Sequence, residues 1–131
     1  MNFTVDSANK ALPYVRGIVA EIREVYARLQ RLGDEHNALP RGDERGRADL
    51  KERIREGAQR VGECQEELKR IGVEVKDYES GLVDFPAELE GRTILLCWKD
   101  GEEAVTHWHE IDTGFRGRKA IPSGKPAWPR V

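Results

Sequence analysis

Residues 8–32 read ANKALPYVRGIVAEIREVYARLQRL, and this stretch decides the first half of the fold. Its apolar side chains return at alternating steps of three and four, which is the spacing of one face of an α-helix. Three short polar side chains near its start can cap such a helix, namely Thr4, Asp6 and Ser7. We therefore predict a long amphipathic helix with a kink or a restart at Pro13, because proline lacks a backbone donor.

A second stripe of the same kind precedes Gly72. Its members include a seven-residue recurrence and are Leu50, Ile54, Ala58, Val61, Cys64, Leu68 and Ile71. Between the stripes, residues 33–47 are polar and contain three glycines and Pro40, so we expect a connecting loop there. Two striped helices joined by a polar loop predict a long antiparallel two-helix hairpin over residues 1–72.

After Gly72 the pattern changes to the alternation of apolar and polar residues that is typical of strands. We predict a small antiparallel sheet over residues 73–112, with strands at 73–78, 82–85, 93–99 and 104–111, and with Pro86 ending the second strand. Both faces of strand 93–99 are apolar, so we expect the hairpin to cover one face and the tail or a partner to cover the other.

The dipeptide Asp100-Gly101 predicts a tight two-residue turn between the last two strands. Such a turn places Arg92 opposite His109 and Ile94 opposite His107. In that register, Cys97 lies on the face opposite both histidines.

The charge of the chain is divided along its length, although the net charge is only −2. Residues 73–112 contain 3 basic and 11 acidic side chains, whereas residues 113–131 contain 5 basic and no acidic ones. Because residues 113–131 are also rich in glycine and proline, we expect an irregular basic strap that folds back on the acidic segment or on that of a second copy. The complete prediction is an α+β fold in a single domain of residues 1–131.

The composition excludes several classes of protein. No apolar stretch approaches 18 residues and no secretory pattern is visible, so we expect no membrane contact and a cytoplasmic location. Two cysteines without C-x-x-C spacing, Cys64 and Cys97, favour reduced thiols. Five basic residues without a recognisable binding motif make nucleic acid an unfavoured partner.

The candidate chemistry lies between residues 92 and 118. His107 and His109 have the spacing that puts two imidazoles on one face of a strand, and Asp112 follows them, so these three are the candidate metal ligands. The alternative is that one histidine packs inside the sheet and the other faces solvent. Cys97 with His109 as base would suit nucleophilic attack, but the expected register and the apolar neighbours of Cys97 favour a buried thiol.

A second hypothesis is a pocket for a small anionic ligand. Guanidinium groups can hold a carboxylate or phosphate while aromatic rings exclude water, and the candidates are Arg92, Trp98, Trp108, Arg116 and Arg118. The alternative is that these arginines pair internally with Asp84, Glu110 or Asp112 and fix the strap to the sheet.

Several short motifs connect this chain with a known family. They are Phe3-Thr4, Ala8-Asn9, Leu12-Pro13 and Val15 at the start, then GLVDFP (81–86), Gly91-Arg92, LCW (96–98), GE (101–102), WHE (108–110), Asp112, GF (114–115) and GR (117–118). With these motifs the chain resembles the uncharacterised bacterial and archaeal domain-of-unknown-function family 2203. The resemblance implies no activity, but it implies that the C-terminal block is the distinguishing part of the family. In that family the position of His107 is often aromatic, which counts against a site that requires both histidines.

Two functions are therefore expected from the sequence. The first is a non-enzymatic cytoplasmic interaction module that forms a homodimer through an apolar edge of its hairpin, including Val19 and Tyr26, with no cofactor. The alternative is a metal- or anion-binding site in the C-terminal block, with a divalent metal as cofactor. Whether the protein is an enzyme stays open.

Overall fold

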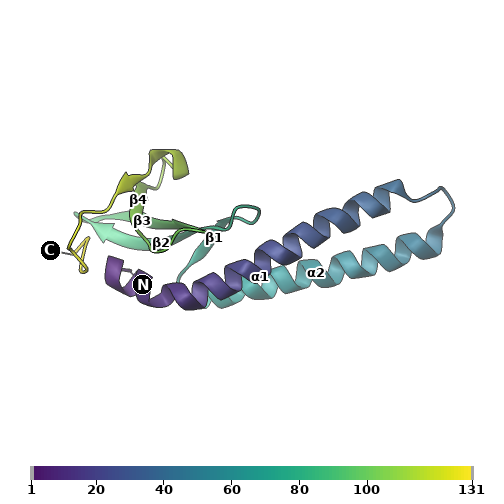
Figure 1. Ribbon diagram of the computed structural model, residues 1–131, viewed down its shortest axis with the longest axis horizontal. Coiled ribbons are helices and arrows are strands. Elements are labelled where there is room, and N and C mark those ends of the chain that lie inside the picture. Colours follow the sequence, from purple (N-terminus) through teal and green to yellow (C-terminus); the bar gives the residue numbers. More distant parts are fainter. Residues whose placement is uncertain (1, 131) are drawn as a thin grey trace.

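The computed structural model describes residues 2–130 and has the predicted α+β architecture (Figure 1). Helix α1 spans Val5–Ala38 and helix α2 spans Glu44–Arg70, and the two form a long hairpin. Thr4 is the N-cap of α1, since its hydroxyl accepts from the amide of Ser7 while the Ser7 hydroxyl accepts from the amide of Thr4. Both predicted apolar stripes supply the buried residues between the helices, which confirms the hairpin.

The connecting loop is shorter than predicted. Only residues 39–43 join the helices, and the side chain of Asp43 caps α2 by accepting from the amide of Gly46 over 2.9 Å. The polar residues on either side are helical because at this end of the hairpin each helix buries a narrow stripe, represented by Leu32 and Leu50. The remaining faces of both helices are in solvent, so polar side chains there do not indicate a loop.

Pro13 does not restart the first helix, because α1 is continuous from Val5 to Ala38. Figure 1 shows the predicted bend instead: the first turns of α1 run in a different direction from the remainder of the helix. The bend directs the start of α1 toward the sheet.

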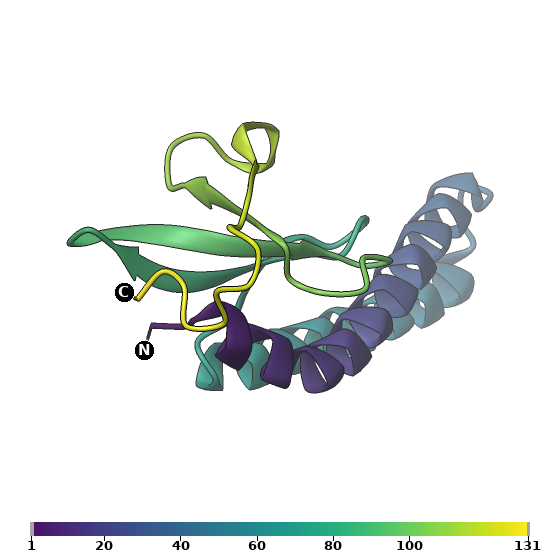
Figure 2. The same cartoon turned by 60° about the vertical axis from the view of Figure 1, so that its left-hand side comes forward.

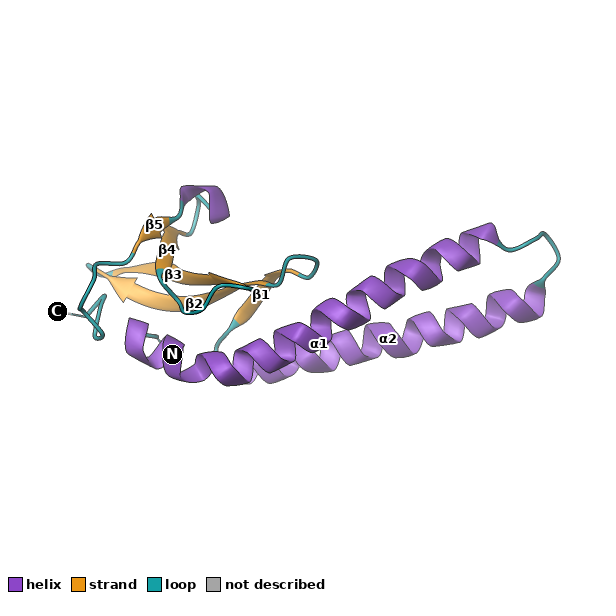
Figure 3. Cartoon of the chain, viewed as in Figure 1, coloured by secondary structure: helices purple, strands orange, loops and turns teal. Residues whose placement is uncertain are grey.

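A five-stranded antiparallel sheet follows the hairpin, with the strands in sequence order (Figure 3). The strands are β1 (Glu74–Asp77), β2 (Leu82–Leu89), β3 (Arg92–Lys99), β4 (His107–Glu110) and β5 (Lys119–Ala120). Two predictions are corrected here. Pro86 does not end β2. The pairing of β1 with β2 ends at Glu74 and Asp84, so no partner on β1 needs the backbone N–H that proline lacks, and β2 continues beside β3. The basic strap is not wholly irregular, since it contributes β5 and a short 3₁₀ helix, η1 (Phe115–Gly117).

The register between β3 and β4 differs from the tight-turn prediction by three residues. Ile94 lies opposite Glu110, and Cys97 lies opposite His107. The turn itself forms, with the amide of Glu102 donating to the carbonyl of Lys99 over 3.0 Å. An odd shift exchanges the two faces of β4, so Cys97 and the two histidines share one face of the sheet, contrary to the prediction.

Helix α1 explains this shift, because it binds the segment that follows the turn. The Asn9 side chain accepts from the amide of Val105 and donates to its carbonyl, over 2.7 and 3.3 Å. The guanidinium of Arg16 donates to the carbonyls of Glu102 and Glu103. These bonds satisfy backbone groups that would otherwise pair with β3, so β4 begins only at His107.

The sheet has an inner and an outer face. The inner face packs on the helices and carries the largest core side chains, among them Phe85, Leu96 and Trp98, all fully buried. The outer face points away from the helices, and Figure 2 shows η1 on that side of the sheet. The far half of the hairpin extends beyond the sheet (Figure 1).

The chain beyond β5 returns to the start of α1. The amide of Val5 donates to the carbonyl of Trp128 over 2.9 Å, and that of Asp6 donates to the carbonyl of Pro126 over 2.8 Å. The Trp128 ring packs on Trp108 with centroids 5.5 Å apart. In residues 2–130, no helix has the length and hydrophobicity needed to span a membrane.

Candidate functional site

A row of polar side chains crosses the outer face of the sheet. In the register of the central strands, Asp84 lies opposite Cys97, and Cys97 lies opposite His107. His109 is two residues further along β4 and therefore points to the same side. Three adjacent strands thus bring a carboxylate, a thiol and two imidazoles to one area.

Three of these side chains form a close cluster, which we call the DCH cluster (Asp84, Cys97 and His109). One potential ligand atom from each residue lies within 4.8 Å of the other two. All three residues are buried, with exposed fractions of 1%, 0% and 3%. Among residues 2–130, the DCH cluster is the group of at least three His, Cys, Asp or Glu side chains that lie close enough together to hold a metal ion.

Both ring nitrogens of His109 face hydrogen-bond acceptors. Nε2 lies 3.0 Å from Oδ1 of Asp84, and Nδ1 lies 2.7 Å from the carbonyl oxygen of Glu110. A carbonyl can only accept, so Nδ1 carries a proton. One further proton then bridges Nε2 and the Asp84 carboxyl, since two facing lone pairs would repel.

Burial controls the ionisation of the other two members. Burial raises the pKa of the Asp84 carboxyl, although the neighbouring His109 acts in the opposite direction. Burial also raises the pKa of the Cys97 thiol, against a smaller opposing effect of Arg118. In the metal-free protein Cys97 is therefore a neutral thiol and a poor nucleophile.

Arg118 joins the strap to this cluster. Its Nε donates to Sγ of Cys97 over 2.9 Å, and its two terminal nitrogens donate to the Glu102 carboxylate over 2.8 and 2.9 Å. Burial raises the pKa of Glu102, but the bonds from Arg118 and from the amide of Lys99 outweigh it and leave that pKa lowered. The Phe115 ring covers the guanidinium, with its centroid 4.6 Å from Cζ.

The residues predicted to form an anion pocket are not gathered in one place. Trp98 is on the inner face, where its Nε1 donates to the carbonyl of Glu102 over 2.9 Å. Trp108 packs on the tail, and Arg116 is exposed. Arg92 pairs with Glu110, which is one of the internal pairings considered as the alternative. Of the five, only Arg118 reaches the DCH cluster.

The three predicted metal ligands do not form one site, because only His109 belongs to the DCH cluster. Asp112 is exposed and lies beyond the end of β4. His107 is half-buried, and its Nδ1 lies 2.9 Å from the hydroxyl of Thr106. Sequence reasoning missed Asp84 as a site residue, although an acid inside the apolar run LVDF was a signal, because a buried carboxylate needs a partner.

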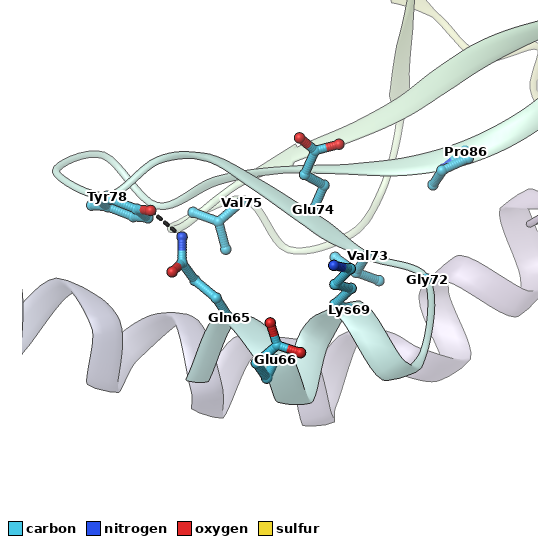
Figure 4. A pocket seen from close by; sticks show the side chains of 9 residues that line it. All are labelled: Gln65, Glu66, Lys69, Gly72, Val73, Glu74, Val75, Tyr78 and Pro86. Atoms are coloured by element: carbon cyan, nitrogen blue, oxygen red, sulfur yellow. Dashed lines mark hydrogen bonds between the residues drawn. The ribbon is translucent and has the colours of Figure 1, made fainter. Parts of the chain in front are cut away.

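A separate groove of about 670 Å³ lies between α2 and β1 (Figure 4). Its apolar lining includes Val73 and Val75, and the Gln65 amide donates to the Tyr78 hydroxyl, which also lines the groove. Its rim is mixed in charge, with Glu66 and Lys69 from α2 and Glu74 from β1. None of the predicted site residues lines this groove.

The chain thus combines a helical hairpin with a five-stranded antiparallel sheet whose outer face holds a buried carboxylate, thiol and imidazole. The chain belongs to the family described as uncharacterized conserved protein (DUF2203), whose model matches residues 2–121. The matched range includes both helices, the whole sheet and Arg118, which confirms the resemblance seen in the sequence motifs. Comparison with curated proteins and with solved structures gives no match.

Proposed function

We propose that this protein binds one transition-metal ion, by preference Zn²⁺, through Oδ of Asp84, Sγ of Cys97 and Nε2 of His109. The observation that carries the proposal is the mutual approach of these atoms to within 4.8 Å in a buried position. Mixed sulfur, nitrogen and oxygen ligands suit Zn²⁺, whereas Mg²⁺ and Ca²⁺ prefer oxygen alone.

The hydrogen bond of His109 to its own strand supports the same assignment. Histidines that ligate metals usually donate their second ring nitrogen to a carbonyl or carboxylate, which fixes the tautomer and the ring plane. Nδ1 of His109 has such a partner in the carbonyl of Glu110. Nε2 is then the metal-binding atom, and its present partner, the Asp84 carboxylate, is the next ligand.

The size of the cluster fits an ion after a small contraction. Zn–S bonds of about 2.3 Å and Zn–N and Zn–O bonds of about 2.0–2.2 Å place tetrahedral ligands roughly 3.3–3.8 Å apart. The separations in the DCH cluster are at most 4.8 Å, and Nε2 of His109 already lies 3.0 Å from Oδ1 of Asp84, so binding requires a contraction of roughly 1 Å at most.

Charge balance also supports the proposal. The Cys97 thiolate and the Asp84 carboxylate neutralise the two positive charges of the ion. Arg118 stabilises the thiolate by donating to sulfur, and Glu102 neutralises Arg118 in turn. Because Cys97 must be reduced to bind the ion, we also propose that the protein resides in a reducing compartment, the cytoplasm.

The bound ion would supply bonds between β2, β3 and β4, and its effect would be on stability. Ligands that bind only the folded state stabilise it, by about 2.7 kcal/mol at a hundred times Kd. The function we infer is therefore a metal-stabilised fold that holds the strap on the outer face of the sheet.

The test is equilibrium zinc binding by competition with a chromophoric chelator, together with thermal unfolding with and without zinc. We expect one ion per chain, a raised Tm, and loss of both effects in Cys97→Ser and in Asp84→Asn. His36→Phe is the control, since His36 is at the far end of the hairpin. Circular dichroism establishes that each variant is folded. Stoichiometric binding that survives in both cluster variants would reject the DCH cluster as the site.

We propose self-association through the hairpin as a second candidate function, because the far half of the hairpin is not covered by the sheet (Figure 1). The edge first expected to pair is partly used within the chain, since Val19 is buried and Tyr26 packs on Tyr78 with ring centroids 5.7 Å apart. The remaining apolar surface includes the half-buried Leu29 and Ile54. A native mass spectrum should give a homodimer of two 14.9 kDa chains, and a monomer at every concentration would exclude this function.

A further inference from the structure

His107 occupies a defined place beside the DCH cluster. It is the direct cross-strand partner of Cys97, as Asp84 is on the other side, so Asp84, Cys97 and His107 form one row across β2, β3 and β4. Directly opposite residues in an antiparallel pair have Cβ atoms about 4.5–5.5 Å apart and point to the same face. The imidazole of His107 can therefore reach an ion bound at Sγ of Cys97.

The two histidines of β4 approach such an ion from neighbouring positions. Residues two apart on a strand share a face and are separated by about 6.5–7 Å at Cα. Zinc sites often include two histidines of one segment, and tetrahedral coordination by four protein groups is the rule where the ion is structural. The DCH cluster supplies three ligands and leaves one position.

His107 is not part of the DCH cluster, so its ring must move to reach that position. Its ring is half-buried, and its Nδ1 contacts the exposed hydroxyl of Thr106, for which water is an equivalent partner. A neutral imidazole adds a ligand without disturbing the charge balance of the ion, Cys97 and Asp84.

We propose that His107 supplies the fourth ligand, which gives a closed tetrahedral site of Asp84, Cys97, His107 and His109. This inference rests on the proposed metal function and extends it. A closed set leaves no position for water or substrate, so the bound ion stabilises the fold and does not catalyse a reaction. The competing arrangement leaves the fourth position to water or to a small anion held near Arg118.

The experiment compares the wild-type protein with His107→Phe, which keeps an aromatic ring at a half-buried position. X-ray absorption of the zinc-loaded proteins counts imidazole ligands by their outer-shell scattering, and the visible bands of the cobalt-loaded proteins report coordination number. We expect two imidazoles and tetrahedral cobalt bands in the wild type, against one imidazole in the variant. Loss of the ligand should weaken zinc binding by at least the roughly 10- to 100-fold typical of outer-shell partners.

The outcomes separate this inference from the metal function itself. If the wild type binds zinc through Cys97 and His109 but contains one imidazole, or if His107→Phe changes neither spectrum nor affinity, His107 is not a ligand and only the inference fails. If the wild type binds no metal, both fail. His107→Gln provides a second variant should the phenylalanine disturb folding, and His36→Phe again serves as the control.

Discussion

Nε of Arg118 donates to Sγ of Cys97 over 2.9 Å, while the terminal nitrogens of the same guanidinium hold the Glu102 carboxylate. One side chain thus connects the strap, the central strand β3 and the turn that follows β3. The sulfur that accepts this bond is also the proposed metal ligand. The sequence left two roles open for Arg118, an external anion or an internal carboxylate, and its partners are a thiol and a carboxylate of the same chain.

Replacing Arg118 by methionine should weaken zinc binding by roughly tenfold or more, within the range known for outer-shell partners. The reason is that the Cys97 thiolate loses its charged donor, and the pKa of that thiol, already raised by burial, rises further. Chelator competition measures the effect. Arg116→Met is the matched control, because Arg116 lies in the same segment but is exposed. An equal loss of affinity in both variants would show that only general positive charge matters.

Zinc binding at pH 7 should release about two protons per ion. One comes from the Cys97 thiol, and the other is the proton that bridges Nε2 of His109 and the Asp84 carboxyl. Isothermal titration in buffers with different ionisation enthalpies measures the number. Release of less than one proton would contradict the proposed ligand set.

The ion pair between Glu21 of α1 and Arg60 of α2 should make the hairpin sensitive to acid. Arg60 bonds both carboxylate oxygens, with Nη2 2.7 Å from Oε1, and holds the pKa of Glu21 below its ordinary 4.5. A lowered pKa gives stability that is present above pH 4.5 and is lost as the pH falls through the lowered value. Besides Arg60, the nearby groups are Cys64, Glu63 and Glu67.

Urea unfolding of the wild type and of Glu21→Gln between pH 3 and 7 tests this effect. The wild type should be the more stable at pH 6, and the difference should shrink toward pH 3. Glu24→Gln, at an exposed position of the same helix, corrects for the general loss of a negative charge. A difference that stays constant across this range would remove the ion pair as its cause.

Two glycines should respond in opposite ways to alanine. Gly81 has φ +72°, and a Cβ there would lie 2.8–2.9 Å from side-chain atoms of Asp100, Arg23 and Val19, so Gly81→Ala should destabilise by more than about 1 kcal/mol. Gly62 is inside α2 with open space around it, so Gly62→Ala should stabilise by about 0.5–1 kcal/mol. Urea midpoints at pH 7 measure both changes. Stabilisation by Gly81→Ala would contradict the close packing of that turn.

The hairpin could be predicted because its signal is local and repeated. Each apolar stripe extends over about six to seven helical turns, and the buried residues of α1 follow it from Ala8 to Leu32. The helix ends near the loop could not be placed from polarity, because residues 34–38 and 44–47 are helical and most of them are exposed. Polarity reports contact with water, and helices at the end of a hairpin have that contact on most sides.

The site could be predicted only in part, because it depends on the register of one strand pair. His109 and Arg118 were named from the sequence as members of a candidate site. Their partners could not be assigned from the sequence. A tight turn at Asp100-Gly101 predicts one register between β3 and β4, whereas the hydrogen bonds of the Asn9 side chain to the backbone of Val105 produce another. Asn9 and Val105 are 96 positions apart in the sequence, so no local sequence pattern predicts their hydrogen bond.

The bonds from Val5 and Asp6 to the carbonyls of Trp128 and Pro126 affect how the protein folds during synthesis. The ribosome adds roughly 5–20 residues per second, so the first turn of α1 waits on the order of ten seconds for these acceptors. Until then its leading amides depend on water and on the Thr4 cap. The hairpin can form early from its own contacts, but the junction between α1 and the C-terminal segment is completed only after residues 126–128 have emerged.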